Sequence, residues 1–246
     1  GKENKYDDDI FFQKYSQMSR SQQGLAGAGE WETLRKLLPD FKDKRVLDLG
    51  CGYGWHCIYA MEHGASSVVG VDISHKMLEV AKEKTHFPQV EYKCCAIEDV
   101  EFPEESFDVI LSSLAFHYVA DYEILVKKIY RILKSGGKLV FTVEHPVFTA
   151  YGTQDWYYNE KGEILHFPVD NYYYEGKRTA VFLGEKVTKF HRTLTTYLNT
   201  LLSNGFIINH IVEPQPPENM MDIPGMRDEM RRPMMLIVSA NKKVDR

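Results

Sequence analysis

Glycines recur at alternate positions in residues 46–54, whose sequence is VLDLGCGYG. One acidic residue and three glycines form the pattern: Asp48, Gly50, Gly52 and Gly54. Glycine permits positive φ and lets a ligand approach the backbone closely. A dinucleotide-binding loop would carry its third glycine at position 55, where Trp55 stands, so the pattern disfavours NAD. A cofactor with a cationic amino-acid end fits better, because Asp48 can help position its ammonium group.

Further residues that could contact a nucleotide follow the next two predicted strands. Asp72 ends the second strand, and a carboxylate there can accept hydrogen bonds from both ribose hydroxyls. Ile73 and Met77 stand where apolar groups could border an adenine, although Met77 fits an ordinary helix core equally well. We therefore expect the nucleotide to lie along the ends of these strands.

Three histidines are candidate general bases. His117 and His145 follow the fourth and fifth predicted strands, and His191 precedes a late helix. Histidine titrates near neutral pH and can accept a proton from a reacting group. Each of the three could instead orient a substrate or satisfy a buried carbonyl, and the sequence leaves these alternatives open.

The elements that must position these residues alternate along the chain. Apolar strands are predicted at 45–49, 67–72, 90–95, 107–113 and 138–143. Helices between them begin near 54, after a Ser74 cap and after an Asp121 cap; the last is expected to end at Gly136-Gly137. Such alternation predicts a parallel α/β sheet with helices on both faces, whose ligands bind at the carboxyl edge. A helix at 193–204 and strands at 206–212 and 234–240 complete the predicted pattern.

An aromatic-rich insertion, at about 147–192, interrupts the pattern. Residues 151–190 contain ten aromatic residues, about twice the 13% of the whole chain. We expect a hairpin of 178–183 and 186–191 around Gly184-Glu185. Trp156, Tyr157 and Tyr173 are candidates to roof an acceptor pocket, and Arg192 could bind an anionic acceptor. Tyrosines also favour interfaces, so the insertion could instead form a dimer surface, and both monomer and homodimer remain open.

Four runs together resemble the class I methyltransferases that depend on S-adenosylmethionine (SAM), in particular the type 11, small-molecule-like group. The runs are VLDLGCGYG, VVGVDISHKML, FPEESFDVILSSLAFHYVADY and ILKSGGKLVFTVEHP. The resemblance is strong over residues 45–147 and looser towards the C-terminus. It implies a Rossmann-like, seven-stranded, mostly parallel sheet in the order 3-2-1-4-5-7-6 with its last strand antiparallel. By matching position it implies SAM contacts at Asp48, Gly50, Gly52, Gly54, Asp72, Ile73, Ile97, Ser112 and Leu114.

The resemblance also implies a division of the chain. Residues 1–40 would form an N-terminal helical cap that closes over SAM, and residues 41–246 the methyltransferase domain. In the cap, Tyr15 and Arg20 are candidates, because a guanidinium fork fits the SAM carboxylate. The family often has Asp after the third strand, where Ala96 stands, so adenine recognition would rest on Glu98 or on the backbone near Ile97.

Composition narrows the class of partner. The formal net charge is −5 and no basic block occurs, which disfavours nucleic acid. Four cysteines lack a zinc-type spacing, which predicts reduced thiols in a cytoplasmic protein that uses no metal. No apolar run reaches the length of a membrane span.

The expected reaction is in-line methyl transfer from SAM to a small molecule, with S-adenosylhomocysteine as product. The acceptor atom is left open. Alternatives are a SAM-binding regulator without catalysis, an RNA or protein methyltransferase, and a NAD-dependent oxidoreductase.

Overall fold

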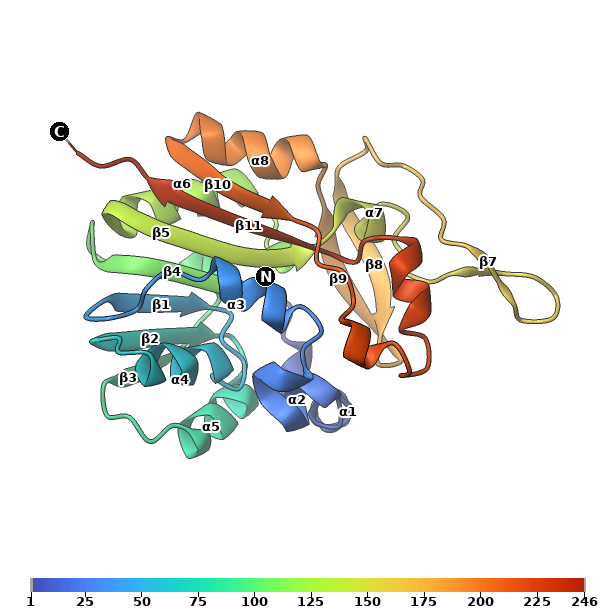
Figure 1. The fold of residues 1–246 in the computed structure, drawn as a ribbon, viewed down its shortest axis with the longest axis horizontal. Coiled ribbons are helices and arrows are strands. Elements are labelled where there is room, and N and C mark those ends of the chain that lie inside the picture. Colours follow the sequence, from blue (N-terminus) through green and yellow to red (C-terminus); the bar gives the residue numbers. More distant parts are fainter. Residues whose placement is uncertain (1, 246) are drawn as a thin grey trace.

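A seven-stranded sheet forms the centre of the protein in a computed structural model that describes residues 2–245 (Figure 1). The strand order is β10-β11-β5-β4-β1-β2-β3, with β11 antiparallel to both neighbours and β1 to β5 mutually parallel. This order confirms the predicted topology. The strands are β1 (Arg45–Leu49), β2 (Ser67–Asp72), β3 (Val90–Cys94), β4 (Phe107–Ser113), β5 (Leu133–Glu144), β10 (Phe206–Val212) and β11 (Met235–Lys242).

Helices cover both faces of this sheet, and each face has its own apolar core. On one face, α6 (Tyr122–Ile132) and α8 (Leu194–Ser203) bury Leu125, Ile129 and Leu201 against the sheet. The other face is covered by α3 (Trp31–Leu37), α4 (Trp55–Glu62) and α5 (His75–Lys84). Alternate residues of β5 supply the two cores, because successive side chains of a strand point to opposite faces.

Side-chain caps begin the helices where the sequence predicts them. Ser74 Oγ accepts a hydrogen bond from the Met77 amide, and Asp121 Oδ1 accepts one from the Ile124 amide. Each cap satisfies an amide of the first turn that has no partner within its helix. The caps therefore fix where α5 and α6 leave the carboxyl edge of the sheet.

The end of α6 differs from the prediction. The helix ends at Ile132, and β5 begins at Leu133 and runs through Gly136-Gly137. The reason is a tertiary contact: the amides of Glu105 and Ser106 donate to the last carbonyls of the helix, at 3.1 and 2.9 Å. These bonds lead the chain directly into pairing with β4.

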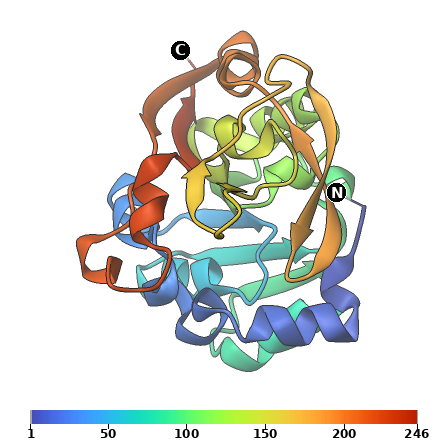
Figure 2. The same cartoon turned by 90° about the vertical axis from the view of Figure 1, so that its right-hand side faces the viewer.

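The N-terminal segment is a series of short helices rather than one long helix. It consists of η1 (Lys5–Asp7), α1 (Asp9–Ser16), α2 (Ser19–Gln23), η2 (Gly24–Gly27) and α3. The chain turns at Met18, which is extended, and at Gly24, whose φ is +66°. Up to η2 the segment lies across the carboxyl edge of the sheet (Figures 1 and 2).

The insertion after β5 also lies at this edge (Figure 2). It contains α7 (Pro146–Thr149), a short ribbon of β6 (Tyr157–Tyr158) and β7 (Ile164–His166), and a hairpin of β8 (Gly176–Phe182) and β9 (Glu185–His191). The hairpin turns at Leu183-Gly184, one residue earlier than predicted, and both residues have positive φ. Short 3-10 turns complete the described chain: η3 (Ile97–Asp99), η4 (Phe116–Tyr118), η5 (Glu218–Met220) and η6 (Arg227–Arg231). Within residues 2–245, no helix has the length and apolarity needed to cross a membrane.

Candidate active site

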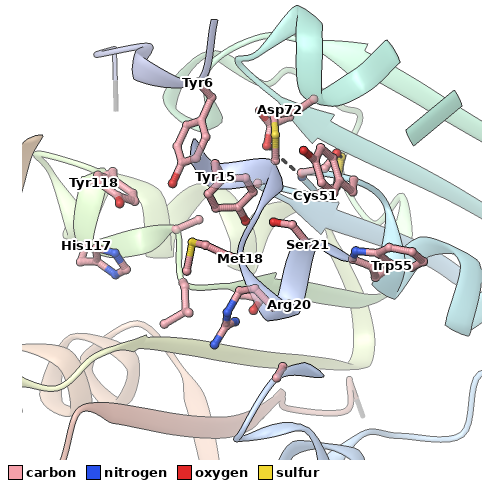
Figure 3. A pocket seen from close by; sticks show the side chains of 18 of the residues that line it. Tyr6, Tyr15, Met18, Arg20, Ser21, Cys51, Trp55, Asp72, His117 and Tyr118 are labelled. Atoms are coloured by element: carbon pink, nitrogen blue, oxygen red, sulfur yellow. Dashed lines mark hydrogen bonds between the residues drawn. The ribbon is translucent and has the colours of Figure 1, made fainter. Parts of the chain in front are cut away.

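A cavity lies at the carboxyl ends of β1, β2, β4 and β5, with about 1720 Å³ of empty space, part of it open to solvent. Figure 3 shows Trp55 and Cys51 at one end, His117 and Tyr118 at the other, and Tyr15 and Ser21 of the N-terminal segment between them. Its lining extends without a break from the glycine loop after β1 to Glu144 and Lys189. Ten predicted site residues line it: Tyr15, Arg20, Gly50, Gly52, Asp72, Ile73, Met77, Ile97, Leu114 and His117.

The glycine loop forms one wall of the cavity. Gly50 and Gly52 have φ of +80° and +53°, which side chains rarely adopt. The Gly50 amide donates to the Val71 carbonyl at 2.8 Å, and the Gly52 amide donates to Asp72 Oδ2 at 2.9 Å. These bonds hold the loop against the end of β2, so that its backbone borders the cavity.

Asp72 is the carboxylate of this wall. Besides the Gly52 amide, it accepts a bond from the Ser74 amide at 2.9 Å. Burial raises the pKa of Asp72, while these two amides favour its ionised form. A carboxylate has about four acceptor positions, so two remain for the hydroxyls of a ribose.

Two residues of the glycine motif lie behind the loop, outside the cavity. Asp48 is buried, and its carboxylate accepts a bond from Cys57 Sγ at 3.6 Å. Burial raises the pKa of Asp48 to about 7. A Cβ on Gly54 would lie 2.3 Å from the Tyr92 hydroxyl, so this glycine is required by packing. The structure therefore places Asp48 and Gly54 as supports of the loop.

The apolar residues predicted near the nucleotide, Ile73, Met77 and Ile97, all line the cavity. Neither Glu98 nor Ser112 does. The Glu98 carbonyl accepts a bond from Lys128 Nζ at 2.8 Å, and Ser112 Oγ donates to the Leu49 carbonyl at 2.6 Å. Ser112 thus ties β4 to β1 instead of facing the cavity.

Leu114 lines the cavity in a strained conformation. Its φ is +52°, in the left-handed region that disfavours a γ-branched side chain. The Leu114 amide donates to the carbonyl and the hydroxyl of Thr142, at 3.0 and 2.9 Å. Strain that neighbouring bonds hold in place is typical of functional sites.

The N-terminal segment brings Tyr15 and Arg20 to the cavity. Arg20 forms a two-pronged ion pair with Glu30, with N–O distances of 3.0 and 3.2 Å. Its fork is therefore directed at a protein carboxylate, whereas the sequence predicts a pair with the SAM carboxylate. Trp55 also lines this end, and its Nε1 is buried without a hydrogen-bond partner among the described residues. Such an atom needs an acceptor, which a bound ligand would supply.

A polar cluster occupies the opposite end of the cavity. Lys189 Nζ lies 2.9 Å from Glu144 Oε2 and 2.8 Å from Gln154 Oε1, and Gln154 Nε2 donates to Glu144 Oε1 at 2.9 Å. His117 Nε2 lies 3.6 Å from Glu144 Oε1. Residue types and spacing did not indicate Glu144 or Lys189 as site residues. The available signals were the place of Glu144 at the end of β5 and that of Lys189 on the inward face of β9, between Val187 and His191.

His117 is neutral at physiological pH, because burial lowers its pKa to about 4. Its Nδ1 accepts a bond from the Glu144 amide at 3.3 Å, so the proton of the neutral ring is on Nε2. Both nitrogens are thereby directed at Glu144. In this arrangement His117 can donate a hydrogen bond into the cluster but presents no free lone pair to a substrate.

The other two histidines and Arg192 lie outside the cavity. His145 Nε2 contacts Glu213 at 2.5 Å, and its Nδ1 accepts the Val147 amide at 3.0 Å. His191 is bonded to Thr149 Oγ1 and to the Tyr172 carbonyl, at 2.7 and 2.8 Å. Arg192 is buried and donates to the carbonyls of Phe116 and Val119. These side chains join the insertion to the sheet edge.

The three aromatic candidates of the insertion also lie outside the cavity. Trp156 packs edge-on against Phe167, Tyr157 stacks on His166, and Tyr173 is 86% exposed. The insertion instead reaches the cavity through the hairpin, by Phe182, Val187 and Lys189. The aromatic content therefore indicated an insertion that does reach the cavity, but the three aromatic residues singled out do not line it.

The residues present fit SAM. The glycine loop, the free acceptor positions of Asp72 and the unpartnered Trp55 Nε1 are complementary to its amino acid and ribose groups. A family model for methyltransferase domains, type 11, matches residues 47–141. The solved SAM-dependent methyltransferase from Mesorhizobium loti is 40% identical, with a TM-score of 0.82, over 89% of this chain and 100% of that one.

The chain belongs to the SAM-dependent methyltransferases. A Listeria monocytogenes structure with a provisional assignment to the same class is 57% identical over 89% of this chain and 99% of that one, with a TM-score of 0.86. A Haemophilus influenzae protein of uncharacterised function is 34% identical over 96% of each chain. SAM is thus the methyl donor of this methyltransferase. No cluster of metal-ligating side chains occurs between residues 2 and 245.

Proposed function

We propose that this methyltransferase transfers the methyl group of SAM directly, by in-line displacement, to a small molecule held in the same cavity. The observation that carries the proposal is the continuity of the cavity. It runs from Gly52 and Asp72, past Leu114, to Glu144 and Lys189. A donor on the glycine loop and an acceptor beside β9 would therefore face each other across the end of β4.

The size of the acceptor follows from what covers this cavity. The N-terminal segment contributes Tyr6, Phe11 and Tyr15 to the lining, and the hairpin contributes Phe182 and Val187. A folded RNA would not pass between these two covers. We propose that residues 1–40 act as the cap of a domain formed by 41–246, and that the hairpin forms the acceptor wall.

When bound, SAM supplies a methyl group on a sulfonium, whose leaving thioether needs no protonation. The chain then has to bind, align and exclude water. Asp72 would accept the ribose hydroxyls, Ile73 and Ile97 would border the adenine, and Trp55 Nε1 would donate to the amino-acid end. Tyr15 and Leu114 would limit access of water to the region between the two ligands.

The experiment that tests this proposal measures S-adenosylhomocysteine released with SAM and a library of small metabolites. We expect acceptor-dependent release that is lost in a Gly52→Val variant, with Tyr173→Ala as the exposed control that retains it. Tight SAM binding without release from any acceptor would favour a regulatory role. Release only with RNA or protein would overturn the small-molecule proposal.

A further inference from the structure

The Glu144–Lys189 ion pair is buried where an acceptor would lie. The two residues are 7% and 3% exposed, and both line the cavity. Burying such a pair costs about as much free energy as the attraction returns, so stability alone does not explain it. Gln154 holds both partners while its own φ is +59°, a strained conformation for a residue other than glycine. The cluster is therefore positioned, at some cost, to face the cavity.

The charges of the pair restrict the group that can bind between them. A cationic amine would be attracted by Glu144 but repelled by Lys189. A carboxylate would be attracted by Lys189 but repelled by Glu144. A hydroxyl is neutral and is both a donor and an acceptor. Lys189 Nζ lies 2.7 and 2.9 Å from the two oxygens of Glu144 and 2.8 Å from Gln154 Oε1. A hydroxyl would replace one of the two contacts with Glu144, donating to that oxygen and accepting from Lys189.

The surrounding side chains favour a flat, unsaturated frame. Lys189 Nζ lies 5.9 Å from the ring centre of Tyr118 and 5.7 Å from that of Phe182. Both rings line the cavity. Aromatic rings pack against one another with their centres about 4.5–7 Å apart, so an aromatic acceptor could pack against Tyr118 or Phe182.

We propose that the acceptor is a phenol or an enol, whose hydroxyl is held between the Glu144 carboxylate and the Lys189 ammonium. The inference rests on the proposed function and names the substrate class of that same site. Glu144 accepts the hydroxyl proton as the oxygen forms its bond to the methyl carbon. The bond from that carbon to the cofactor sulfur breaks, giving a methyl ether, neutral S-adenosylhomocysteine and one proton, which later passes to solvent.

The acidity of the base decides between kinds of hydroxyl. Burial raises the pKa of Glu144, but His117, Lys189 and Gln154 outweigh burial and lower it. A weakly basic carboxylate can assist a phenol, whose pKa is about 10, far better than an aliphatic hydroxyl, which is close to water at about 16. The titratable groups that face Glu144 are Lys189 of β9, His117 and Tyr118 of η4, with Arg192 and Tyr197 behind them and Glu3 near Tyr118.

The first arm of the test uses aromatic acceptors that share one frame and differ in one group. Naphthols, naphthylamines, naphthoates and naphthalenemethanols, with single-ring counterparts, would be incubated with the full chain and SAM. We expect S-adenosylhomocysteine release from the phenolic members to be at least about tenfold faster than from the others. Faster methylation of amines, carboxylates or aliphatic alcohols would overturn the phenol proposal while leaving the proposed function intact. Release from no compound of any class, although SAM binds, would overturn both.

The second arm uses Glu144→Gln, with melting temperature and SAM affinity as checks on folding. Loss of a general base lowers kcat by about 10²–10⁴-fold. We expect the variant to recover about tenfold in rate for each pH unit up to the pKa of the phenol, because a phenolate needs no base. Equal losses at every pH would mean that Glu144 is structural and would contradict its role. Because Glu144→Gln leaves Lys189 unpaired, the double variant with Lys189→Met provides a second test in which no buried charge is left unpaired.

Discussion

The glycines after β1 serve different purposes at the scale of single residues. A Cβ on Gly50 would lie 2.6 Å from the Cβ of Ala115, a buried residue between β4 and η4. A Cβ on Gly52 would meet only the flexible end of Met77, at 3.1 Å, on the cavity side. The first glycine is therefore needed for packing and the second for the ligand.

This difference predicts opposite results for a matched pair of variants. Gly50→Ala should lower the free energy of unfolding by roughly 2 kcal/mol or more, because backbone and side chain must shift. Gly52→Ala should lower the free energy of unfolding by only about 1 kcal/mol, because alanine disfavours a positive φ. The same variant should bind SAM at least about tenfold more weakly. Urea unfolding and calorimetric titration with SAM measure the two effects. Equal stabilities of the two variants would show that the contact with Ala115 does not constrain the loop.

Asp72 should contribute to both binding and folding. Asp72→Ala removes an acceptor for ribose hydroxyls and for the amides of Gly52 and Ser74, at about 1–3 kcal/mol for each group left unpaired. We expect SAM affinity to fall about ten- to a hundredfold and the melting temperature of the unliganded protein to fall as well. Wild-type affinity in calorimetric titration would show that the ribose does not bind at this carboxylate.

The buried Asp48 predicts a pH dependence of stability. Its folded pKa of about 7 lies above the ordinary value of 3.8, so folding favours the protonated form. The stability it contributes is complete below pH 3.8 and is lost as the pH rises to about 7. Asparagine at this position does not titrate. As the pH rises from 4 to 8, the free energy of unfolding of Asp48→Asn should therefore increase relative to that of wild type by roughly 1–4 kcal/mol, at about 1.4 kcal/mol for each pKa unit. Urea unfolding at pH 4 and pH 8 measures this change. The same difference in unfolding free energy between variant and wild type at both pH values would contradict the prediction.

The sequence could identify the cofactor half of the site but only part of the acceptor half. Gly50, Gly52, Asp72 and Ile97 each stand at or just after the end of a strand of the parallel sheet, so the strand pattern alone places them at the carboxyl edge. Lys189 reaches Glu144 across 45 residues, through a hairpin whose position against β5 depends on tertiary packing. No local pattern reports such a contact.

At the scale of elements, the hairpin β8–β9 determines the shape of the acceptor wall. Its turn places Leu183 and Gly184 at φ of +52° and +78°, the conformation that two-residue hairpin turns require. Leucine is poorly suited to it. Lys14 Nζ donates to the Leu183 carbonyl at 3.0 Å, which joins the turn to α1.

We therefore expect Leu183→Asn to stabilise the protein by about 0.5–1 kcal/mol, because asparagine tolerates the left-handed region. The backbone bond to Lys14 would be kept. Thermal unfolding with Val181→Asn, at an exposed strand position of the same hairpin, provides the control. A melting temperature for Leu183→Asn at or below wild type would mean that the turn is not strained.

Sequence periodicity predicted the strands of the sheet and the starts of α5 and α6. It failed at the end of α6, because the bonds from Glu105 and Ser106 that end the helix come from a distant loop. It predicted a helical cap at residues 1–40 but not the turns at Met18 and Gly24 that divide the cap, since helical propensity continues across Met18.

At the scale of the whole molecule, the N-terminal segment and the hairpin close the cavity from two sides. Both line the cavity, and they contact each other through the hydrogen bond from Lys14 to the Leu183 carbonyl. SAM binding should therefore order both covers together. We expect S-adenosylhomocysteine to slow amide hydrogen exchange in residues 9–27 and 176–191, with β10 as the unaffected control. Protection confined to the glycine loop would mean that the covers do not respond to the cofactor.

The most direct measurement is a crystal structure with S-adenosylhomocysteine bound. We expect the ribose hydroxyls at Asp72, the amino-acid end near Trp55 Nε1, and the sulfur facing the open space that Glu144 and Lys189 line. Binding of the product elsewhere, or with its sulfur directed away from Glu144, would mean that one cavity does not hold both the methyl donor and the acceptor.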